Sequence, residues 1–228
     1  MNILFFGACL TQESIPEGYL VVSQEQQASW TRNFNPFMVA GISRWPTNAG
    51  IYEPMMIYSP LQGQYVPWLA SAYHWNSDAT EIRFEIRKGV LWSDGQTFSH
   101  RDVEFTFSLM KRYPALDTRG IWNKISQLSI EEDQVIFSFS QPFASGLDAL
   151  AHQAIVPEHI WSKIEDPVTF ANPNPVGTGP FTEVLHFGSQ QWDLGQNPHY
   201  WQSLENGPVA LRFPAFPSNE QASLALLK

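Results

Sequence analysis

The sequence predicts a mixed α/β fold, and three patterns support that class. Residues 81–87 alternate strictly between polar and apolar side chains, which is typical of a half-buried strand. Residues 99–113 carry apolar side chains at helical spacing behind a capping residue. Two more alternating segments follow within 128–139. Strands and helices therefore succeed one another within one unit.

The composition allows a substantial core and an unusually neutral surface. At 228 residues the chain can form one large domain or two small ones, and 43% of its residues are hydrophobic. Only 15% are charged, against about a quarter in an ordinary protein. Aromatic residues make up 14%, including 9 Trp, which suits a protein that handles neutral polar ligands such as sugars. Most of these rings are nevertheless expected in the core.

The charge and the single cysteine exclude several classes of protein. The net charge of −9 leaves no basic patch to neutralise phosphates, so nucleic acid is not an expected partner. One cysteine, Cys9, permits neither an internal disulfide nor a cysteine metal cluster. No run of about 20 apolar residues predicts a membrane span.

The segment before Cys9 leaves two interpretations open. Residues 3–9 form a short apolar run that ends in two small residues and the cysteine, which resembles a bacterial lipoprotein signal. No Lys or Arg precedes the run, and it is shorter than a full hydrophobic signal region. Either the start of a precursor is missing and Cys9 carries a lipid, or the likeness is accidental.

In the N-terminal part, the elements are short. Residues 10–18 are polar and read as a tether, and residues 19–22 predict a strand. The loop at 30–37 contains Asn33 and Asn35. Their amides either satisfy the turn itself or present hydrogen-bonding groups to a polar ligand, together with the neighbouring Arg32.

The next segment mixes a helical turn with strands. Residues 49–60 predict a helical turn stopped by proline and then a short strand, and Gly63 predicts a hairpin-type turn. Residues 65–75 are apolar and look irregular. After the strand at 81–87, Asp94-Gly95 predicts a turn.

The helix at 99–113 has the clearest start signal. Ser99 with Asp102 three residues later approaches the capping-box pattern. Val103, Phe107 and Met110 fall on one face, which we expect to be buried.

The remaining elements are predicted by alternation, by proline and by helix-capping residues. A hairpin has its tip at Glu131-Glu132-Asp133, and helical segments occupy 142–150 and the residues after Pro157. Strands are expected at 181–187, 191–194 and 209–213, and a helix at 219–227 with Ala222, Ala225 and Leu226 inward. This helix has neither a glycine cap nor a proline stop, so we expect the natural chain to continue.

Residues 174–181, with the sequence NPVGTGPF, are rich in proline and glycine and interrupt the predicted helices and strands. Proline fixes φ and glycine reaches conformations that other residues avoid. We interpret this stretch as a crossing between two parts of the molecule, with an ordinary surface turn as the alternative.

No catalytic constellation stands out. The six histidines do not pair at i,i+4, no HExxH or GxSxG motif occurs, and Cys9 lies too close to the terminus for a nucleophile. Gly177-Thr178-Gly179 lacks the Gly-Lys-Ser/Thr of a phosphate loop. None of the 22 carboxylates is singled out as a glycosidase pair. We expect a protein that is not an enzyme and has no metal and no cofactor.

Three motifs together resemble a known family. FEIRKGVLWSDGQTFSHRDVEFTF, NPVGTGPF and QNPHYW, in this order, resemble elements of the extracellular solute-binding proteins of ABC importers, the peptide, nickel and oligosaccharide group known as family 5. The resemblance covers roughly residues 19–228. Within the family, WTRNFNPF and residues 156–181 look most like binders of β-1,4-linked oligosaccharides, such as chito- or cello-oligosaccharides.

The resemblance implies a periplasmic-binding-protein-like lobe I with an inserted smaller domain. Residues 1–18 would be the signal-like segment and tether, 19–48 with 175–228 a discontinuous lobe I, and 49–174 the inserted domain. The crossing would return the chain to lobe I. The second lobe would lie beyond this N-terminal piece.

The implied function is capture of an oligosaccharide in the periplasm, or at the outer face of the membrane, for delivery to the permease subunits of an ABC importer. The membrane would be reached only through a lipid on Cys9. The expected ligand-binding residues are Arg32, Asn33, Asn35, Phe37, Trp45 and Glu53. Alternatives are an oligopeptide or dipeptide ligand within the same family, and a glycoside hydrolase outside it. The loop offers Arg32 but no nearby acid for a peptide terminus, which favours sugar.

Overall fold

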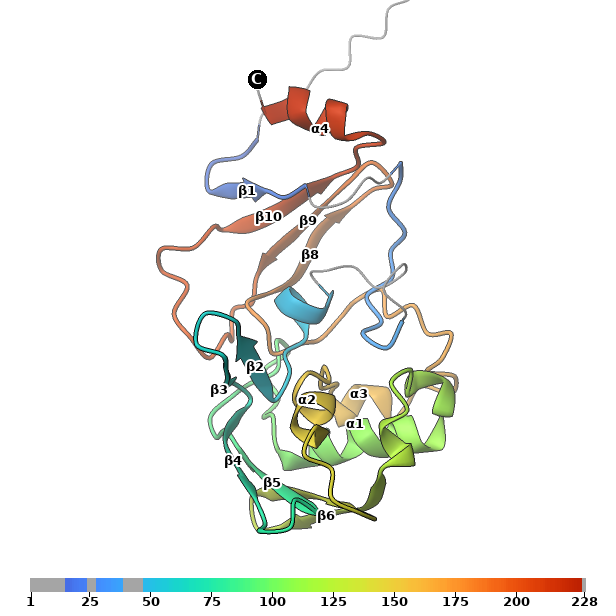
Figure 1. Ribbon diagram of the computed structural model, residues 1–228. Helices are drawn as coiled ribbons and strands as arrows, with labels where there is room; N and C mark the ends of the chain where they lie inside the picture. The colour runs from blue at the N-terminus through green and yellow to red at the C-terminus, as the bar shows by residue number, and fades with distance from the viewer. Residues whose placement is uncertain (1–14, 24–27, 39–46, 227–228) are drawn as a thin grey trace, which may run out of the picture.

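Two four-stranded sheets dominate the computed structural model, which describes residues 15–23, 28–38 and 47–226 (Figure 1). The first sheet has the order β1-β10-β9-β8, in which β1 runs parallel to β10 and the other neighbours are antiparallel. Its strands are β1 (Tyr19–Val21), β8 (Phe181–Phe187), β9 (Gln191–Gln196) and β10 (Ala210–Pro214). The first strand of the chain thus pairs with its last, and the mixed α/β class is confirmed.

The second sheet is antiparallel, with the order β4-β5-β7-β6. Its strands are β4 (Ala70–Trp75), β5 (Glu81–Ile86), β6 (Ile125–Glu131) and β7 (Gln134–Phe139). The predicted alternation of β5 is confirmed, since Ile82 and Phe84 are fully buried. This sheet is joined to the first through a separate hairpin of β2 (Met56–Ser59) and β3 (Gln64–Pro67) and the turn η1 (Thr47–Ile51) (Figure 1).

The expectation of irregular structure at 65–75 is wrong. The segment contains the end of β3 and the whole of β4. Its side chains are half-buried on both faces, which hides the period-2 pattern that identifies a strand. Pairing with β5, for example Tyr73 opposite Phe84, makes the segment a strand.

Four α-helices accompany the sheets in the described part of the chain. They are α1 (His100–Arg112), α2 (Gly146–Ala151), α3 (Glu158–Trp161) and α4 (Asn219–Leu226), and 3-10 turns occupy Pro114–Leu116 and Ile121–Asn123. The capping box of α1 is confirmed: the Ser99 side chain accepts from the backbone at Arg101, and Asp102 Oδ2 accepts from Ser99 N at 2.9 Å. The helix predicted at 142–150 begins only at Gly146.

The last helix lacks the buried face that the sequence predicts. Ala222 is half-buried but Ala225 is exposed, and Leu226 has no described side chain. α4 lies at one end of the molecule, with the first sheet between it and the second sheet (Figure 1).

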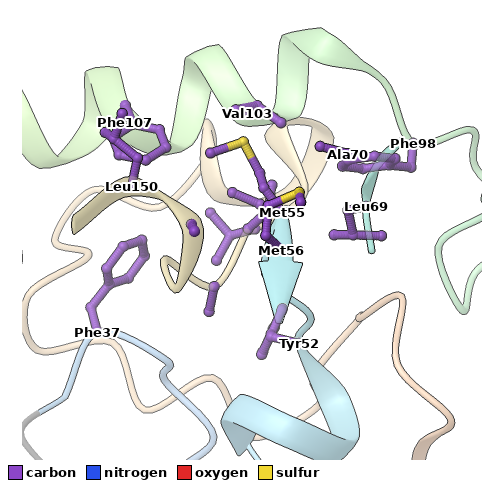
Figure 2. Close-up of a cluster of buried hydrophobic side chains, with 14 of the residues drawn as sticks. Phe37, Tyr52, Met55, Met56, Leu69, Ala70, Phe98, Val103, Phe107 and Leu150 are labelled. Atoms are coloured by element: carbon purple, nitrogen blue, oxygen red, sulfur yellow. The ribbon is translucent and has the colours of Figure 1, made fainter. Parts of the chain in front are cut away.

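The main hydrophobic cluster lies where the hairpin, α1 and α2 meet. Met55 and Met56 enter it from the start of β2, Phe107 from α1 and Leu150 from α2, and Phe37 reaches it from the N-terminal loop (Figure 2). The Phe107 ring packs edge-on against Phe137 of β7, with ring centroids 4.7 Å apart. The loop at 30–38 is therefore anchored in the same core as the second sheet.

The crossing at 174–180 packs backbone against backbone. Gly179 N donates to Ile51 O at 2.9 Å. A Cβ on Gly177 would overlap the Ile51 carbonyl, and one on Gly179 would overlap the Gly50 carbonyl. Neither glycine has a positive φ. The glycines are required for space, not for the unusual backbone conformation that the sequence suggested.

We expect Gly179→Ala to destabilise the fold by about 3 kcal/mol, because the added methyl group must displace the backbone at Gly50. The measurement is the free energy of unfolding in urea.

Gly207→Ala is the matched control. Gly207 also lacks a positive φ, and its added Cβ would lie 3.3 Å from Leu204 O. Equal losses in the two variants would contradict the proposed close approach.

Candidate functional site

Arg32 is an exposed residue that joins the N-terminal loop to the crossing. Its Nε donates to Pro173 O at 2.9 Å and its second terminal nitrogen donates to Asn174 Oδ1 at 2.8 Å. The guanidinium carbon lies 5.8 Å from the ring centroid of Phe187. The other terminal nitrogen has no acceptor among the described residues. Among the described residues, the guanidinium is thus oriented through two of its three nitrogens.

Asn33 is half-buried and uses only one end of its amide within the protein. Its Oδ1 accepts from Asn35 N at 3.0 Å, the pattern of an Asx turn. Its Nδ2 has no acceptor within the described part of the chain. As at Arg32, a donor of Asn33 is left without an acceptor by the residues that the structure describes.

Asn35, in contrast, is fully buried and fully engaged. Its Nδ2 donates to Pro167 O at 3.1 Å and to Phe170 O at 2.7 Å, and its Oδ1 accepts from Phe37 N at 2.9 Å. A ligand could reach this amide only if those hydrogen bonds broke. The geometry therefore gives Asn35 the work of fastening the loop to the segment at 166–171.

Asn172 fastens the loop from the other side. It is 2% exposed, and its Nδ2 donates to Phe34 O at 2.9 Å and to Tyr52 Oη at 2.7 Å. Burial raises the pKa of the Tyr52 hydroxyl well above its ordinary value, so this tyrosine stays neutral. Asn35 and Asn172 together hold both ends of a short piece of loop.

Phe37 is a core residue in this structure. Its side chain is 7% exposed and its ring meets the Trp161 ring edge-on, with centroids 5.4 Å apart. The ring points toward the cluster of Figure 2, so its faces are occupied by other side chains.

Glu53 lies in the interior, between the hairpin and the loop after β9. It is 3% exposed. Its Oε1 accepts from Trp68 Nε1 at 2.6 Å and from Tyr200 Oη at 3.3 Å, and its Oε2 accepts from Trp201 Nε1 at 3.0 Å. Burial raises the pKa of this carboxyl, and the hydrogen bonds from Trp201, Trp68 and Tyr200 act in the opposite sense.

Arg87 completes this junction without pairing directly with Glu53. Its Nε donates to Trp68 O at 2.5 Å, and its guanidinium carbon lies 4.7 Å from the Trp201 ring centroid. Arg87 thus contacts the backbone of one of the two tryptophans that bond Glu53 and the ring of the other. Glu53 itself accepts from three aromatic side chains and is almost fully buried, so the described residues leave little of its carboxyl exposed.

Two of the predicted residues lie outside the described residues: Trp45 and Cys9. Sequence reasoning also missed Asn172 and Asn174, which it assigned only to backbone geometry. Two asparagines interleaved with prolines were a usable signal, because an amide in such a constrained segment has a defined position. Their partners, about 140 positions earlier, could not be inferred from the sequence.

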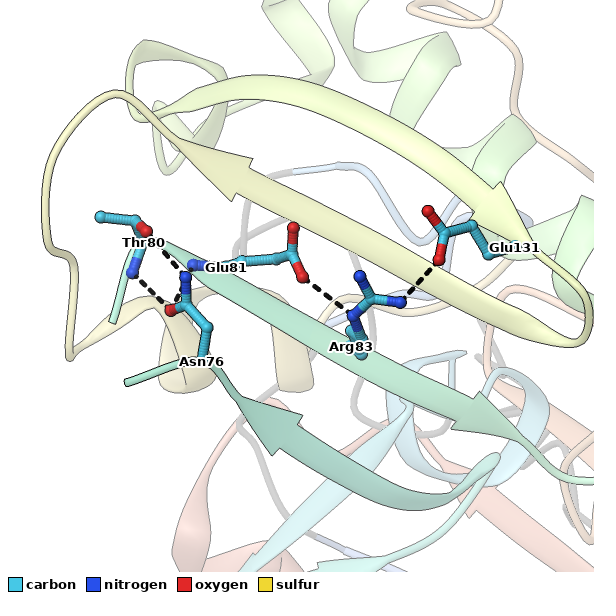
Figure 3. Close-up of polar contacts among 5 residues, drawn as sticks. All are labelled: Asn76, Thr80, Glu81, Arg83 and Glu131. Carbon is cyan, nitrogen blue, oxygen red and sulfur yellow. Dashed lines mark hydrogen bonds and ion pairs between the residues drawn. The ribbon is translucent and has the colours of Figure 1, made fainter. Parts of the chain in front are cut away.

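A second polar network lies on the outer face of the β4-β5-β7-β6 sheet (Figure 3). Arg83 bridges Glu81 at 2.8 Å and Glu131 at 2.7 Å, and Asn76 Oδ1 accepts from the backbone of Thr80 and Glu81. Every one of these groups has a partner across the strands or the turn. The network stabilises the sheet and offers no free set of ligand groups.

Metal and membrane features are absent from the described part of the chain. None of its His, Cys, Asp and Glu side chains gather in threes as metal ligands require. None of its helices combines the length and the apolar character needed to cross a bilayer.

Comparison with known proteins identifies the family to which this fold belongs. The model of the bacterial extracellular solute-binding proteins, family 5 (middle part), matches residues 64–228. The chain belongs to this family.

Individual relatives are 28% identical to this chain over the aligned residues. A protein of Brucella ovis, named as a peptide-binding protein of an ABC transporter, is 28% identical over 174 residues, which are 74% of this chain and 32% of that protein. Peptidoglycan-binding protein YepA of Agrobacterium fabrum is 28% identical over 188 residues, 74% of this chain and 29% of YepA. The chain thus spans about a third of the length of the curated relatives it matches.

Solved structures agree on the fold. A periplasmic oligopeptide-binding protein of Thermotoga maritima with bound mannohexaose superposes with a TM-score of 0.82 and 28% identity, over 93% of this chain and 40% of that one. NikZ of Campylobacter jejuni, bound to Ni(L-His), gives a TM-score of 0.77 at 21% identity, over 93% of this chain and 42% of NikZ. The latter similarity shows the fold alone.

We expect Asn35→Ala to lower the free energy of unfolding by about 3 kcal/mol, because it leaves two buried carbonyls and one buried N–H without partners. Thermal or urea denaturation measures the loss. Asn33→Ala removes a single hydrogen bond and serves as the control. A loss no larger than that of the control would argue against the fastening role.

Glu53 should make stability depend on pH. Its folded-state pKa is raised above the ordinary 4.5, so the folded protein holds the proton more tightly than the unfolded chain. The stabilising contribution of the protonated form is complete below the unfolded pKa and is lost as pH rises through the folded pKa. As pH rises from mildly acidic to neutral, the free energy of unfolding should therefore fall less for Glu53→Gln than for the unaltered protein. Parallel stability–pH curves for the two proteins would refute the assignment.

Proposed function

We propose that this chain is the ligand-capturing part of the substrate-binding component of an ABC importer. The observation that carries the proposal is its membership of family 5, together with a fold that matches 93% of the chain to a binding protein with bound ligand. The partners would be a small-molecule ligand and the permease subunits. The site of action would be the periplasm or the outer face of the membrane, and lipidation of Cys9 remains part of the proposal.

The ligand that we favour is a β-1,4-linked oligosaccharide, of the chito- or cello-oligosaccharide type. The support is chemical: Arg32 and Asn33 keep donors free at an exposed edge, and the loop at 28–38 contains no carboxylate. Neutral hydroxyl groups need such planar donors and no compensating charge. The mannohexaose in the Thermotoga complex is a neutral sugar of the same general kind.

The peptide alternative has equal support from the relatives. The Brucella relative is named for peptide binding, and a dipeptide-binding protein of Pseudoalteromonas sp. SM9913 with bound Met-Leu has the same fold at 21% identity and a TM-score of 0.76. Peptide termini carry charges, so a peptide site would require an acidic group that the loop at 28–38 does not provide.

We divide the proposed contact roles by exposure. Arg32 and Asn33 would touch the ligand, and Trp45 is retained as a further contact. Asn35 and Phe37 would position the loop from beneath, and Glu53 would hold the junction beside it. Ligand contacts from those three would require a rearranged loop.

The proposed domain division follows the sheets. Residues 19–48 and 175–228 would form the discontinuous lobe I, which contains the β1-β10-β9-β8 sheet, and residues 49–174 the inserted domain with the β4-β5-β7-β6 sheet. The parallel pairing of β1 with β10 supports joining the two ends of the chain in one lobe.

Calorimetric titration of the protein in its natural length tests the function. The panel is chitotetraose, cellotetraose, mannohexaose and a set of di- and oligopeptides, and each mixture is then analysed by chromatography. We expect one class to bind and to be recovered intact. Cleaved oligosaccharide would instead support the glycoside hydrolase alternative.

Arg32→Ala should weaken binding of that ligand about tenfold or more, since a hydrogen bond from a charged donor contributes roughly 1.5–3 kcal/mol. Arg83→Ala is the matched control, because Arg83 is a partly exposed arginine on the outer face of the other sheet. If both variants bind as the unaltered protein does, the loop is not the contact surface.

A further inference from the structure

We infer that Asn174 is a specificity-determining residue of the ligand site, donating from Nδ2 to a neutral oxygen of the ligand. This rests on the proposed function as a solute-binding component. It adds to the site a residue from the crossing, which the sequence treated as backbone geometry alone.

The orientation of the Asn174 amide follows from its partner. Asn174 is exposed, and its Oδ1 accepts from Arg32 at 2.8 Å. The oxygen end of the amide therefore faces the guanidinium, and the nitrogen end faces away from it. No acceptor for Asn174 Nδ2 occurs among the described residues, so both of its hydrogens are available to a ligand.

The backbone around Asn174 is held on both sides. Pro175 follows Asn174 and restricts its φ and ψ, and the preceding Pro173 has a fixed φ and accepts from Arg32 Nε through its carbonyl at 2.9 Å. Two residues earlier, Asn172 is buried and bonded to the loop. Three residues later, Gly177 O accepts from Ser93 N at 2.9 Å. A side chain in such a segment loses little freedom when it binds a ligand.

The free donors gather from two segments that are far apart in the sequence. Arg32 links them directly, since its guanidinium donates to the amide oxygen of Asn174 at 2.8 Å. Asn33 adds its own unused Nδ2 next to Arg32 in the chain. Adjacent planar donors of this kind suit neighbouring oxygens on one ligand, such as the vicinal hydroxyls of a sugar ring.

A structural role alone would require only the oxygen of Asn174. Asn174→Asp separates the two roles, because aspartate keeps an acceptor for Arg32, now as an ion pair, and removes both Nδ2 hydrogens. We expect thermal stability to be unchanged and affinity for the bound member of the panel to fall about tenfold, the worth of one lost hydrogen bond.

Asn206→Asp is the matched control, since Asn206 is also exposed and the change in net charge is the same. It should bind with unchanged affinity. Calorimetry with the member of the panel that binds the unaltered protein is the measurement, at the same ionic strength for all proteins.

Each outcome decides between defined alternatives. Unchanged affinity of Asn174→Asp would overturn the inference and leave Asn174 as a partner of Arg32 only. Tighter binding would also overturn it, because it would place a cationic ligand group beside residue 174. If the unaltered protein binds no member of the panel, the proposed function fails first and this inference with it.

Discussion

The close approach of two backbone segments determines how the two sheets meet. Gly179 N bonds to Ile51 O, and the space between the segments admits no side chain at Gly177 or Gly179. Other contacts converge on the same segment: Asn197 Nδ2 donates to Gly179 O at 2.9 Å, and Ser93 bonds to Gly177. A side chain larger than hydrogen at either position would push the segment that leads into β8 away from the turn η1.

The junction beside this approach is polar, although it is buried. Glu53 accepts hydrogen bonds from Trp68 of the hairpin region and from Tyr200 and Trp201 of the loop after β9. A buried carboxylate is costly unless donors surround it, and here the donors come from both sides of the junction. All of these donors reach the carboxyl only when those two parts are correctly docked. Such a group specifies an arrangement more than it adds net stability.

The candidate site is supported by this rigid base. Asn35 and Asn172 use their amides to fix the loop at 30–38, and this leaves Arg32, Asn33 and Asn174 at its exposed edge. One set of asparagines supplies position and the other supplies free donors. The residue type is the same in both, so burial and not identity separates the supporting residues from the proposed contacts.

The sequence by itself determined the class of fold, most of the element positions and the family. Alternation, capping residues and proline are local signals, and they located β5, α1 and the β6–β7 hairpin because each depends on residues close in the chain. The local signals failed at β4, whose period was hidden. They located α4 but wrongly predicted that Ala225 faces inward. They also suggested the wrong reason for the glycines of the crossing.

Only the tertiary structure decided which polar residues hold the loop in place and which lie at its exposed edge. Asn33 and Asn35 are two positions apart and look equivalent in the sequence, yet one keeps a free amide and the other is enclosed by carbonyls from residues 132 and 135 positions away. The side chains of Glu53 and Phe37 are also buried. Burial and long-range hydrogen bonds depend on how distant segments pack, and no local pattern encodes that packing.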